Sequence, residues 1–340
     1  MHNREPFDPR TLREAARDPK TAVASLLRFA ILAPSSHNTQ PWLFRPAGNG
    51  IEVFGDGKRM LPASDASHRQ FFISIGCTIE NIMIAADYYG LSPRLDYFPD
   101  IKKPLLAARI KLSFPPRPIS AGAEHLIFAI PRRHSNREPF SKMPITEDFL
   151  ARLAKLPDPG ATVKFISDSE RKQLVAKVVG DATEAAFHDK GFCRELSHWI
   201  KPSLRMYHDG MPGYNIGIPW LASFIVPLAI RFAPVAKQQR KMVDTLTAAA
   251  PVFGIITSQA DDPAGHLAVG RSLERIWLTA TLANIKLGFF AAPVEIGDFY
   301  RNLQDAANIA ERPEAIFRLG YADKIPPPSP RRGVENVLIS

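Results

Sequence analysis

The order of helix and strand patterns in the first part of this 340-residue chain recurs in the second part, and this repetition limits the folds that the chain can adopt. Each part contains an amphipathic helix pattern, short strand patterns, a long apolar helix pattern and a closing strand. The two long helix patterns are similar to each other, and Glu274 in the second matches Glu80 in the first. We therefore expect two related halves, residues 1–120 and 121–340, packed around one core.

The individual elements are predicted from the spacing of apolar residues and from the turn residues between them. Helices are expected over residues 22–32, 75–89, 145–156 and 270–287, and strands over residues 42–44, 51–54, 108–114, 163–167, 252–257 and 317–321. Gly90 follows the second helix pattern, at the position where a helix-ending glycine is preferred. The expected fold class is α+β, with a mainly antiparallel sheet flanked by helices in each half and an approximate twofold relation between the halves.

One segment, at about residues 190–235, has no counterpart in the first half. It is rich in aromatic residues, glycine and proline. Long insertions inside compact domains are often lids or binding loops. The alternative is a peripheral helical excursion that covers an apolar face.

Composition and charge exclude several classes of protein. The 43 Lys and Arg against 34 Asp and Glu give a net charge of +9, but the basic residues are scattered, which disfavours nucleic acid and leaves an anionic ligand open.

Two cysteines, Cys77 and Cys193, cannot form a disulfide framework and indicate a reducing compartment. The longest apolar stretch, residues 220–230, is too short to span a bilayer, which takes ~20 residues. We expect a cytoplasmic protein with no nucleic-acid partner and no membrane partner.

The common catalytic fingerprints are missing from the chain. It has no P-loop, no G-x-G-x-x-G, no G-x-S-x-G and no H-E-x-x-H motif. The nine histidines form no pair at i, i+4 on a clear helix face, so no metal site is expected.

Two polar segments remain as candidate binding sites. Residues 33–42 place short hydrogen-bonding side chains between two prolines, which suits a heteroaromatic ligand with alternating donors and acceptors, although a capped helix end would have the same composition. Residues 132–140 contain three arginines with a Ser and a His among them, and a second basic cluster follows at residues 329–332. Arginine clusters of this kind bind phosphate through charge-assisted hydrogen bonds, or are solvated turns.

The chain resembles the FMN-dependent nitroreductase superfamily in four segments. These are PSSHNTQPW at residues 34–42, RRHSNREPF at 132–140, LERIWLTATLANIKLG at 273–288, and the ending FRLGYAD with PSPRR at 317–332. The nearest branch is the twin-domain, Acg-like one, in which both halves of a nitroreductase dimer are fused in one chain. The resemblance extends from about residue 26 to residue 338.

The resemblance implies a flavin site made by both halves. The segment of the second half that would hold the FMN phosphate, ribityl chain and pyrimidine edge contains Arg133, His134, Ser135 and Arg137. The residues that would reach the same flavin from the first half are Pro34, Ser35, Ser36 and Asn38. The resemblance further places Arg331 and Arg332 over the phosphate and Glu295 beside the flavin ring. Each motif occurs once, so one FMN per chain is expected. The run from Pro293 to Gly297, which contains Glu295, departs from the residue spacing that is usual in the family.

The function that the resemblance implies is an NAD(P)H-dependent oxidoreductase that reduces nitroaromatic, quinone or related small-molecule acceptors by a ping-pong mechanism. This fits the lack of acid, base and nucleophile motifs, because a flavin carries the chemistry itself. The alternative is a flavin-sequestering protein with little turnover, in which the insertion at residues 190–235 closes the FMN site. The chain is expected to be a monomeric pseudo-dimer or a homodimer.

Overall fold

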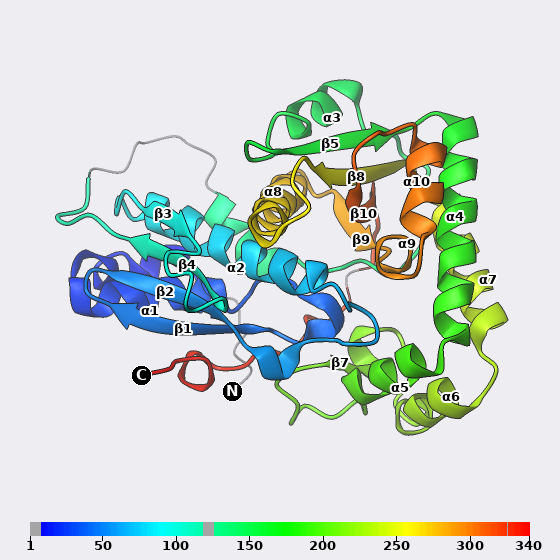
Figure 1. Cartoon of the computed structure of the whole chain (residues 1–340), viewed down its shortest axis with the longest axis horizontal. Coiled ribbons are helices and arrows are strands. Elements are labelled where there is room, and N and C mark those ends of the chain that lie inside the picture. The colour runs from blue at the N-terminus through cyan, green and yellow to red at the C-terminus, as the bar shows by residue number, and fades with distance from the viewer. Residues whose placement is uncertain (1–7, 118–125, 325) are drawn as a thin grey trace.

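The computed structural model of the chain describes residues 8–117, 126–324 and 326–340. It contains two four-stranded antiparallel sheets, which lie on either side of two long central helices (Figure 1). This confirms the expected α+β class. The boundary predicted between residues 120 and 121 lies outside the described residues.

The first sheet has the strand order β1–β2–β4–β3. Its strands are β1 (Trp42–Ala47), β2 (Gly50–Gly55), β3 (Arg94–Tyr97) and β4 (Leu106–Lys111). The turn between β1 and β2 contains Gly48 with a φ of +56°, a backbone conformation that glycine adopts without strain. Trp42, Phe44 and Ile51 are completely buried, so this sheet contributes one face to the main core.

The second sheet has the strand order β5–β8–β10–β9. Its strands are β5 (Ala161–Ile166), β8 (Val252–Ser258), β9 (Lys286–Phe289) and β10 (Pro313–Gly320). Alternate residues of the central strands face opposite sides. Ile256 and Phe317 belong to the core shared with the first half, whereas Ile255 and Ile316 belong to a second core under the outer helices. Both faces are covered, so every residue of β8 and β10 is buried, including Glu314 and Arg318.

The central helices are α2 (Arg69–Tyr88) and α8 (Pro263–Leu282). They cross at Gly76 and Gly270, whose Cα atoms leave no room for a side chain: a Cβ on either glycine would lie 2.9 Å from the Cα of the other. Glycine is required here for close approach of two backbones. By length and composition α2 could cross a membrane, but 78% of its apolar stretch is buried inside the protein, as expected for a core helix.

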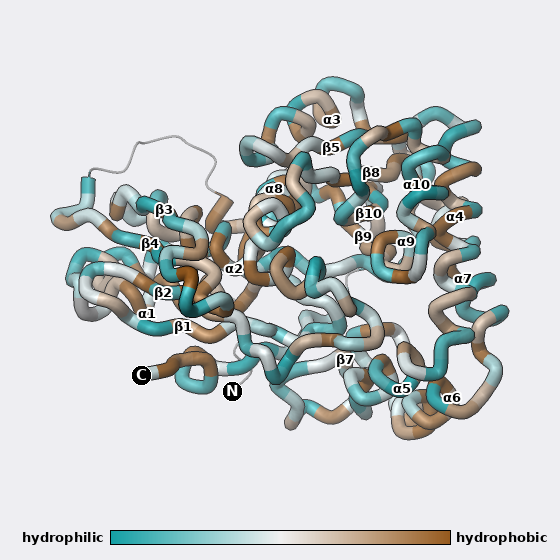
Figure 2. The backbone as a smooth tube through the Cα atoms, viewed as in Figure 1, coloured by the Kyte–Doolittle hydropathy of each residue, from teal (hydrophilic) through white to brown (hydrophobic). Residues whose placement is uncertain are grey.

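Further helices cover the remaining faces. In the first half, α1 (Pro19–Ala30) packs against α2. The outer side of the second sheet is covered by α4 (Ser169–His188), α7 (Ala236–Ala248), α9 (Ala292–Glu295) and α10 (Phe299–Ala307), while α3 (Glu147–Leu153) precedes β5. Figure 2 shows apolar segments turned inward at the central helices and polar segments along the outer helices.

The segment at residues 190–235 forms a small helical layer rather than an irregular loop. It consists of α5 (Lys190–Trp199), a short parallel pair of β6 (Ile200–Lys201) with β7 (Met211–Pro212), and α6 (Val226–Phe232). The layer has its own apolar cluster, defined here as the insertion core, in which Phe192, Leu196, Met211 and Ile230 are buried. The helices of this segment therefore have a core of their own.

Several predicted boundaries need correction. The helix predicted over residues 270–287 begins at Pro263 and ends at Leu282, because Asp262 caps its N-terminus and Asn284 turns the chain with a φ of +59°. Residues 286–289 are strand β9 instead. The first long helix also begins earlier than predicted, at Arg69. The sequence patterns did not predict strand β3 or helices α4, α7 and α10.

Candidate active site

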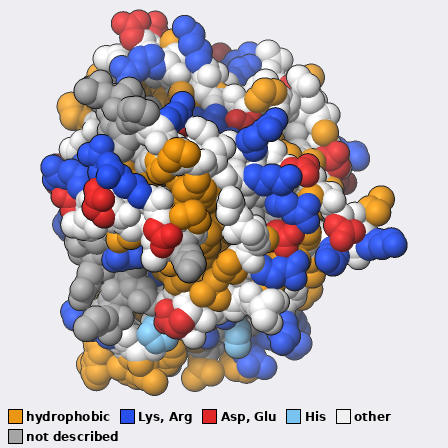
Figure 3. Space-filling view, turned by 90° about the vertical axis from the view of Figure 1, so that its left-hand side faces the viewer, with side chains coloured by type: hydrophobic (Ala, Val, Ile, Leu, Met, Phe, Trp, Pro, Cys, Tyr) orange, Lys and Arg blue, Asp and Glu red, His pale blue; other side chains and the backbone are white. Residues whose placement is uncertain are grey.

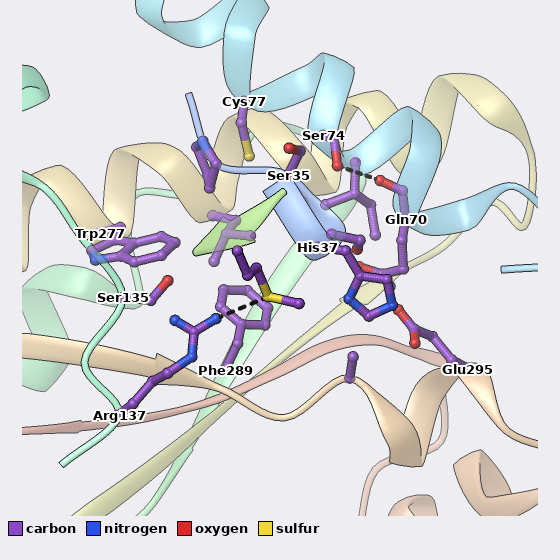
Figure 4. A pocket seen from close by; sticks show the side chains of 16 residues that line it. Ser35, His37, Gln70, Ser74, Cys77, Ser135, Arg137, Trp277, Phe289 and Glu295 are labelled. Carbon is purple, nitrogen blue, oxygen red and sulfur yellow. Dashed lines mark hydrogen bonds between the residues drawn. The ribbon is translucent and has the colours of Figure 1, made fainter. Parts of the chain in front are cut away.

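A cavity of about 210 Å³ lies between the central helices and the ends of both candidate binding segments. Its lining comes from both halves of the chain (Figure 4). The lining residues are Pro34, Ser35, Ser36, His37, Gln70, Ile73, Ser74, Cys77, Ser135, Arg137, Met211, Leu273, Trp277, Phe289, Ala291 and Glu295. Six of the eleven predicted site residues are among them: Pro34, Ser35, Ser36, Ser135, Arg137 and Glu295. The other five, Arg133, His134, Asn38, Arg331 and Arg332, are not.

The wall from the first half is the loop after α1, residues 33–40. Three of its non-glycine residues, His37, Asn38 and Gln40, have φ between +50° and +55°, a region that costs such residues free energy. The loop is held by its own side chains, because the Ser35 hydroxyl accepts a hydrogen bond of 2.9 Å from the Gln40 N–H. The Asn38 amide donates to the carbonyl of Gly210 at 2.8 Å, which ties the loop to the insertion.

Two of the predicted phosphate ligands lie behind this loop instead of in the cavity. Arg331 is 3% exposed and donates to the Asn38 Oδ1 atom at 2.8 Å and to the Ala33 carbonyl at 3.0 Å. The Arg332 backbone donates to the Gln40 side chain at 2.8 Å. These contacts fix the shape of the strained loop. The basic pair therefore positions the cavity wall and does not line the cavity.

The wall from the second half is the segment at residues 133–137. Ser135 forms a parallel bridge with Leu287 of β9, which holds the segment against the sheet edge. Arg133, one of the predicted cofactor ligands, is 2% exposed and pairs with Glu274 of α8 at 3.2 Å. It also donates to the Leu32 carbonyl at 2.7 Å, so it links the two halves. His134 contacts the Arg132 carbonyl through Nδ1 at 2.8 Å and lies outside the cavity lining.

Arg137 is the cation of the cavity. In Figure 4 its guanidinium points into the cavity near Ser135 and Trp277, and its Nη2 atom lies 3.5 Å from the Met211 sulfur. Desolvation lowers the pKa of Arg137 to about 10, so the group is still protonated at neutral pH. Among the described residues, no carboxylate lies within ion-pair distance of it. The exposed surface of Arg137 therefore faces the cavity as a positive charge with no internal counter-ion.

His37 and Glu295 face the opposite end of the cavity (Figure 4). Burial lowers the pKa of His37 to about 4, and the nearby Arg137 lowers it further while Glu195 opposes the shift. Burial also raises the pKa of Glu295 well above its usual range, and the acidic groups of Asp65 and Glu195 add to that effect. The imidazole of His37 is therefore neutral at pH 7, and burial disfavours the charged form of the Glu295 carboxyl that lines the same cavity.

The insertion is attached to this end of the cavity through Glu195 of α5. Its carboxylate accepts hydrogen bonds from the backbone N–H groups of Ala63 and Ser64, at 3.0 and 2.9 Å, and from the Ser64 hydroxyl. That hydroxyl lies 3.5 Å from the His37 Nε2 atom. The contact series Glu195, Ser64 and His37 connects the insertion to the cavity wall.

Most of the cavity lining from the central helices was not predicted. Gln70, Ile73, Ser74 and Cys77 come from one face of α2, and Leu273 and Trp277 come from one face of α8. Their spacing of three and four residues could have identified a shared face, but the same spacing is found for any buried helix face. Cys77 is buried, and burial raises the pKa of its thiol well above the usual range, as expected for an unreactive cysteine.

On α2, the position that corresponds to Glu274 of α8 lies in a network of ion pairs. Glu80, the counterpart of Glu274, pairs with Arg275 at 2.7 Å, and Arg275 donates to the Leu156 carbonyl at 2.8 Å, as Arg133 does to Leu32. Asp158 adds a 2.7 Å ion pair with Arg271. The charged side chains around Glu80 pair with one another. Arg137, which has no carboxylate partner among the described residues, faces the cavity instead.

One group of possible metal ligands, Asp261, His266 and Glu314, lies at the start of the central helices. The guanidinium of Arg69 occupies the space between them: it pairs with Asp261, lies 3.2 Å from Glu314 and lies 3.0 Å from the His266 Nε2 atom. The Arg69 cation is therefore already the positive partner of this group.

No protein-family model matches the chain. A Mycobacterium tuberculosis protein named "Putative NAD(P)H nitroreductase Rv3131" is 26% identical over 329 residues, which cover 93% of this chain and 90% of that protein. The M. tuberculosis protein named "Putative NAD(P)H nitroreductase acg" is 25% identical over 93% of this chain and 95% of its own length. Among solved structures, an FMN- and NADPH-dependent nitroreductase NfnB of Sphigopyxis sp. strain HMH matches 63% of this chain and 98% of its own, with 18% identity and a TM-score of 0.42.

The two relatives span nearly the whole chain, including both sheets and the insertion. Their names confirm the resemblance to nitroreductases, and the second confirms the similarity to Acg-like proteins.

Proposed function

We propose that this chain, which is similar to the Acg nitroreductase over 93% of its length, binds one FMN in the cavity and passes electrons from NAD(P)H to a small acceptor in the cytoplasm. The observation that carries the proposal is the meeting of two motif segments, residues 34–38 and 133–137, which lie about a hundred positions apart in the chain and share one cavity. FMN, when bound, supplies the hydride-transfer chemistry.

The chemistry of the lining fits a flavin. Apolar walls from Ile73, Leu273, Trp277 and Phe289 suit an aromatic ring system. The hydroxyl groups of Ser35 and Ser135 can accept and donate hydrogen bonds at its polar edge. Arg137 supplies the single positive charge, which would stabilise negative charge on a bound anionic or reduced group.

The remaining predicted ligands receive a revised role in this proposal. Asn38, Arg331 and Arg332 hold the strained loop from behind, and Arg133 joins that loop to α8. These residues position the groups that contact FMN. Glu295, whose charged form burial disfavours, and His37, with its imidazole neutral, face the far end of the cavity, where they can form hydrogen bonds to a second ligand.

The proposal is tested by titrating the apo-protein with FMN and recording the flavin absorbance near ~450 nm before and after anaerobic addition of NADPH. The Arg137→Gln variant is expected to bind FMN at least ~10-fold more weakly, because one charge-assisted hydrogen bond contributes about 1.5–3 kcal/mol. Arg132→Gln is the matched control, since Arg132 is a neighbouring arginine that does not line the cavity. Equal FMN affinity in the wild type and Arg137→Gln, or no FMN binding at all, contradicts the proposed site.

A second candidate function is flavin sequestration, and contacts of the insertion favour it. Met211 lies against Arg137, and the carbonyls of Gly210 and His208 accept hydrogen bonds from Asn38 and Gln40. These contacts support the proposal that the insertion covers the cavity. A reconstituted FMN that NADPH does not bleach supports sequestration, and rapid NADPH oxidation by the intact holoprotein rules it out.

The oligomeric state belongs to the same proposal. We propose that the chain, with both halves of a nitroreductase-like unit in one polypeptide, provides its own complete flavin site as a monomer. Analytical ultracentrifugation of the holoprotein distinguishes this from a homodimer.

A further inference from the structure

The insertion carries an unusual concentration of exposed apolar side chains. Seven of the twelve large apolar residues that are exposed in the described structure lie between residues 206 and 232. Five of them, defined here as the outer stripe, are Leu221, Phe224, Ile225, Leu228 and Phe232, with exposures of 42% to 74%. Soluble monomers rarely leave contiguous apolar patches of this kind uncovered unless they bind something there.

The outer stripe has helical spacing. Its members recur at steps of three and four residues through the 3-10 turn Ala222–Phe224 and helix α6, so they lie on one side of this segment. The opposite side is apolar as well: Ile230 is 6% exposed in the insertion core, and Val226 packs against it. A helix with apolar residues on two opposite sides is expected inside a protein or at a membrane, yet the outer stripe is exposed in the described part of the structure.

The charge around the outer stripe has one sign. Residues 196–237 contain four Lys and Arg, namely Lys201, Arg205, Arg231 and Lys237, and one acidic residue, Asp209, whose carboxylate pairs with Arg59 at 2.9 Å. Arg205, Arg231 and Lys237 are exposed. Arg231 is part of α6 itself, with its guanidinium 5.1 Å from the Phe232 ring.

The apolar and basic groups form a surface at one edge of the molecule. The Ser203 backbone N–H donates to the Ser223 hydroxyl at 2.9 Å, which brings residues 203–206 beside the outer stripe. In Figure 1, α5 and α6 lie along the lower edge of the molecule. Figure 3, which faces the left-hand side of Figure 1, shows apolar side chains gathered along the lower edge of the molecule.

From this combination we propose that the outer stripe docks the protein on the surface of a lipid bilayer with anionic headgroups. The apolar residues enter the boundary between headgroups and acyl chains, and the basic residues contact the headgroups. The segment lies on the membrane and does not span it, in agreement with its short apolar length.

Charge decides between a bilayer and a second copy of the chain. In a twofold contact the same patch meets itself, so the basic residues around one stripe would face those around the other. Like charges across an interface are unfavourable, whereas an anionic surface is complementary to them. This proposal does not depend on flavin binding.

Trp220 provides an internal probe of docking. It is 58% exposed and packs edge-to-face on Phe224 at 5.2 Å between ring centroids. The other three tryptophans, Trp42, Trp199 and Trp277, are buried, with exposures of 9% or less. A fluorescence blue shift on adding vesicles therefore reports on Trp220, and the Trp220→Phe variant should bind vesicles without the shift.

The experiment is co-sedimentation of the full chain with vesicles of phosphatidylcholine mixed with phosphatidylglycerol, and with vesicles of phosphatidylcholine alone. The wild type is expected to sediment with the mixed vesicles, to show the blue shift, and to be released by high salt. The double variant Ile225→Asn, Phe232→Asn should bind at least ~10-fold more weakly, because these side chains enter the apolar boundary. Ile101→Asn is the matched control: Ile101 is 94% exposed, far from the insertion, and should leave binding unchanged.

Three results overturn the proposal. The first is no sedimentation of the wild type with the mixed vesicles, and the second is equal binding by the double variant. The third is a concentration-dependent dimer that the double variant dissociates, without vesicle binding, which would assign the outer stripe to a second copy. Circular dichroism of the double variant checks its fold, and because both side chains are exposed, its spectrum should match the wild type.

Discussion

Replacing Gly270 with alanine should destabilise the protein, although alanine is the better helix former. Gly270 lies in the middle of α8 at its crossing with α2. An added Cβ would lie 2.8 Å from the carbonyl carbon of Ile73, 2.9 Å from the Cα of Gly76, and closer still to the Ile73 carbonyl oxygen. All three are backbone atoms, so no side chain can rotate to relieve the contact, and the two helices must separate.

The magnitude follows from two opposing terms. Alanine favours a helix over glycine by about 1 kcal/mol. Overpacking costs about 1–3 kcal/mol, and the upper end applies here because only a backbone shift can relieve the contact. A helix separation of about 0.5 Å also removes a quarter or more of the dispersion energy of the side chains packed across the crossing. We expect the free energy of unfolding to fall by about 2 kcal/mol.

Urea unfolding of the apo-protein, followed by tryptophan fluorescence, measures this change without interference from a ligand. Gly57→Ala is the matched control, since its Cβ would meet only the Leu105 side chain at 3.6 Å, an ordinary contact, and should change stability by less than ~0.5 kcal/mol. A Gly270→Ala variant that is as stable as the wild type, or more stable, would refute the account of the crossing, because helix propensity alone would then explain the result.

Two further predictions concern the loop that forms the cavity wall. Arg331→Gln should lower the free energy of unfolding by about 2–4 kcal/mol even without FMN, because the Ala33 carbonyl and the Asn38 side chain lose a buried donor. Urea unfolding of the apo-protein measures this change. An unchanged unfolding midpoint together with weakened FMN binding would make Arg331 a direct ligand. Burial lowers the pKa of His37 from 6.5 to about 4. The unfolded state therefore binds a proton on this imidazole more tightly than the folded state does. The contribution of His37 to the free energy of unfolding is fully present above pH 6.5 and is lost as the pH falls towards 4. His37→Gln should lose less stability between pH 7 and 5 than the wild type, whereas His188→Gln, at an exposed histidine, should show the wild-type pH dependence.

The sequence was sufficient to predict the two-part architecture, because the repeated order depends on local patterns. The turn at Gly48 and the helix end at Gly90 are local signals, and both occur with positive φ in the structure. The start of α8 was placed too late because its first two turns, from Pro263 onward, contain small residues and a histidine and have little apolar contrast. The signal that marks the true start is the cap, because Asp262 accepts a hydrogen bond from the Gly265 N–H directly before this weak pattern.

The candidate site was predictable only in part, for a different physical reason. Ser35, Ser135 and Arg137 were identified because short motifs carry them, and they do share one cavity. Arg331 stands in an equally basic motif but donates to backbone carbonyls. The residue type is the same in both roles, and only the folded chain determines whether a guanidinium faces a cavity or a loop.

For the insertion too, the sequence does not determine which side chains are covered and which are exposed. The apolar run at residues 220–230 predicts that the segment does not span a bilayer, but sequence alone does not determine which of its apolar residues are covered. The structure divides them: Ile230 and Val226 attach α6 to the insertion core beside Met211, and the outer stripe faces away from it. Because the inner residues hold α6 in place, substitutions in the outer stripe can remove bilayer contact while the cavity wall at Met211 is preserved. The vesicle experiment and the flavin titration therefore test separate faces of one small layer, and either proposal can fail without the other.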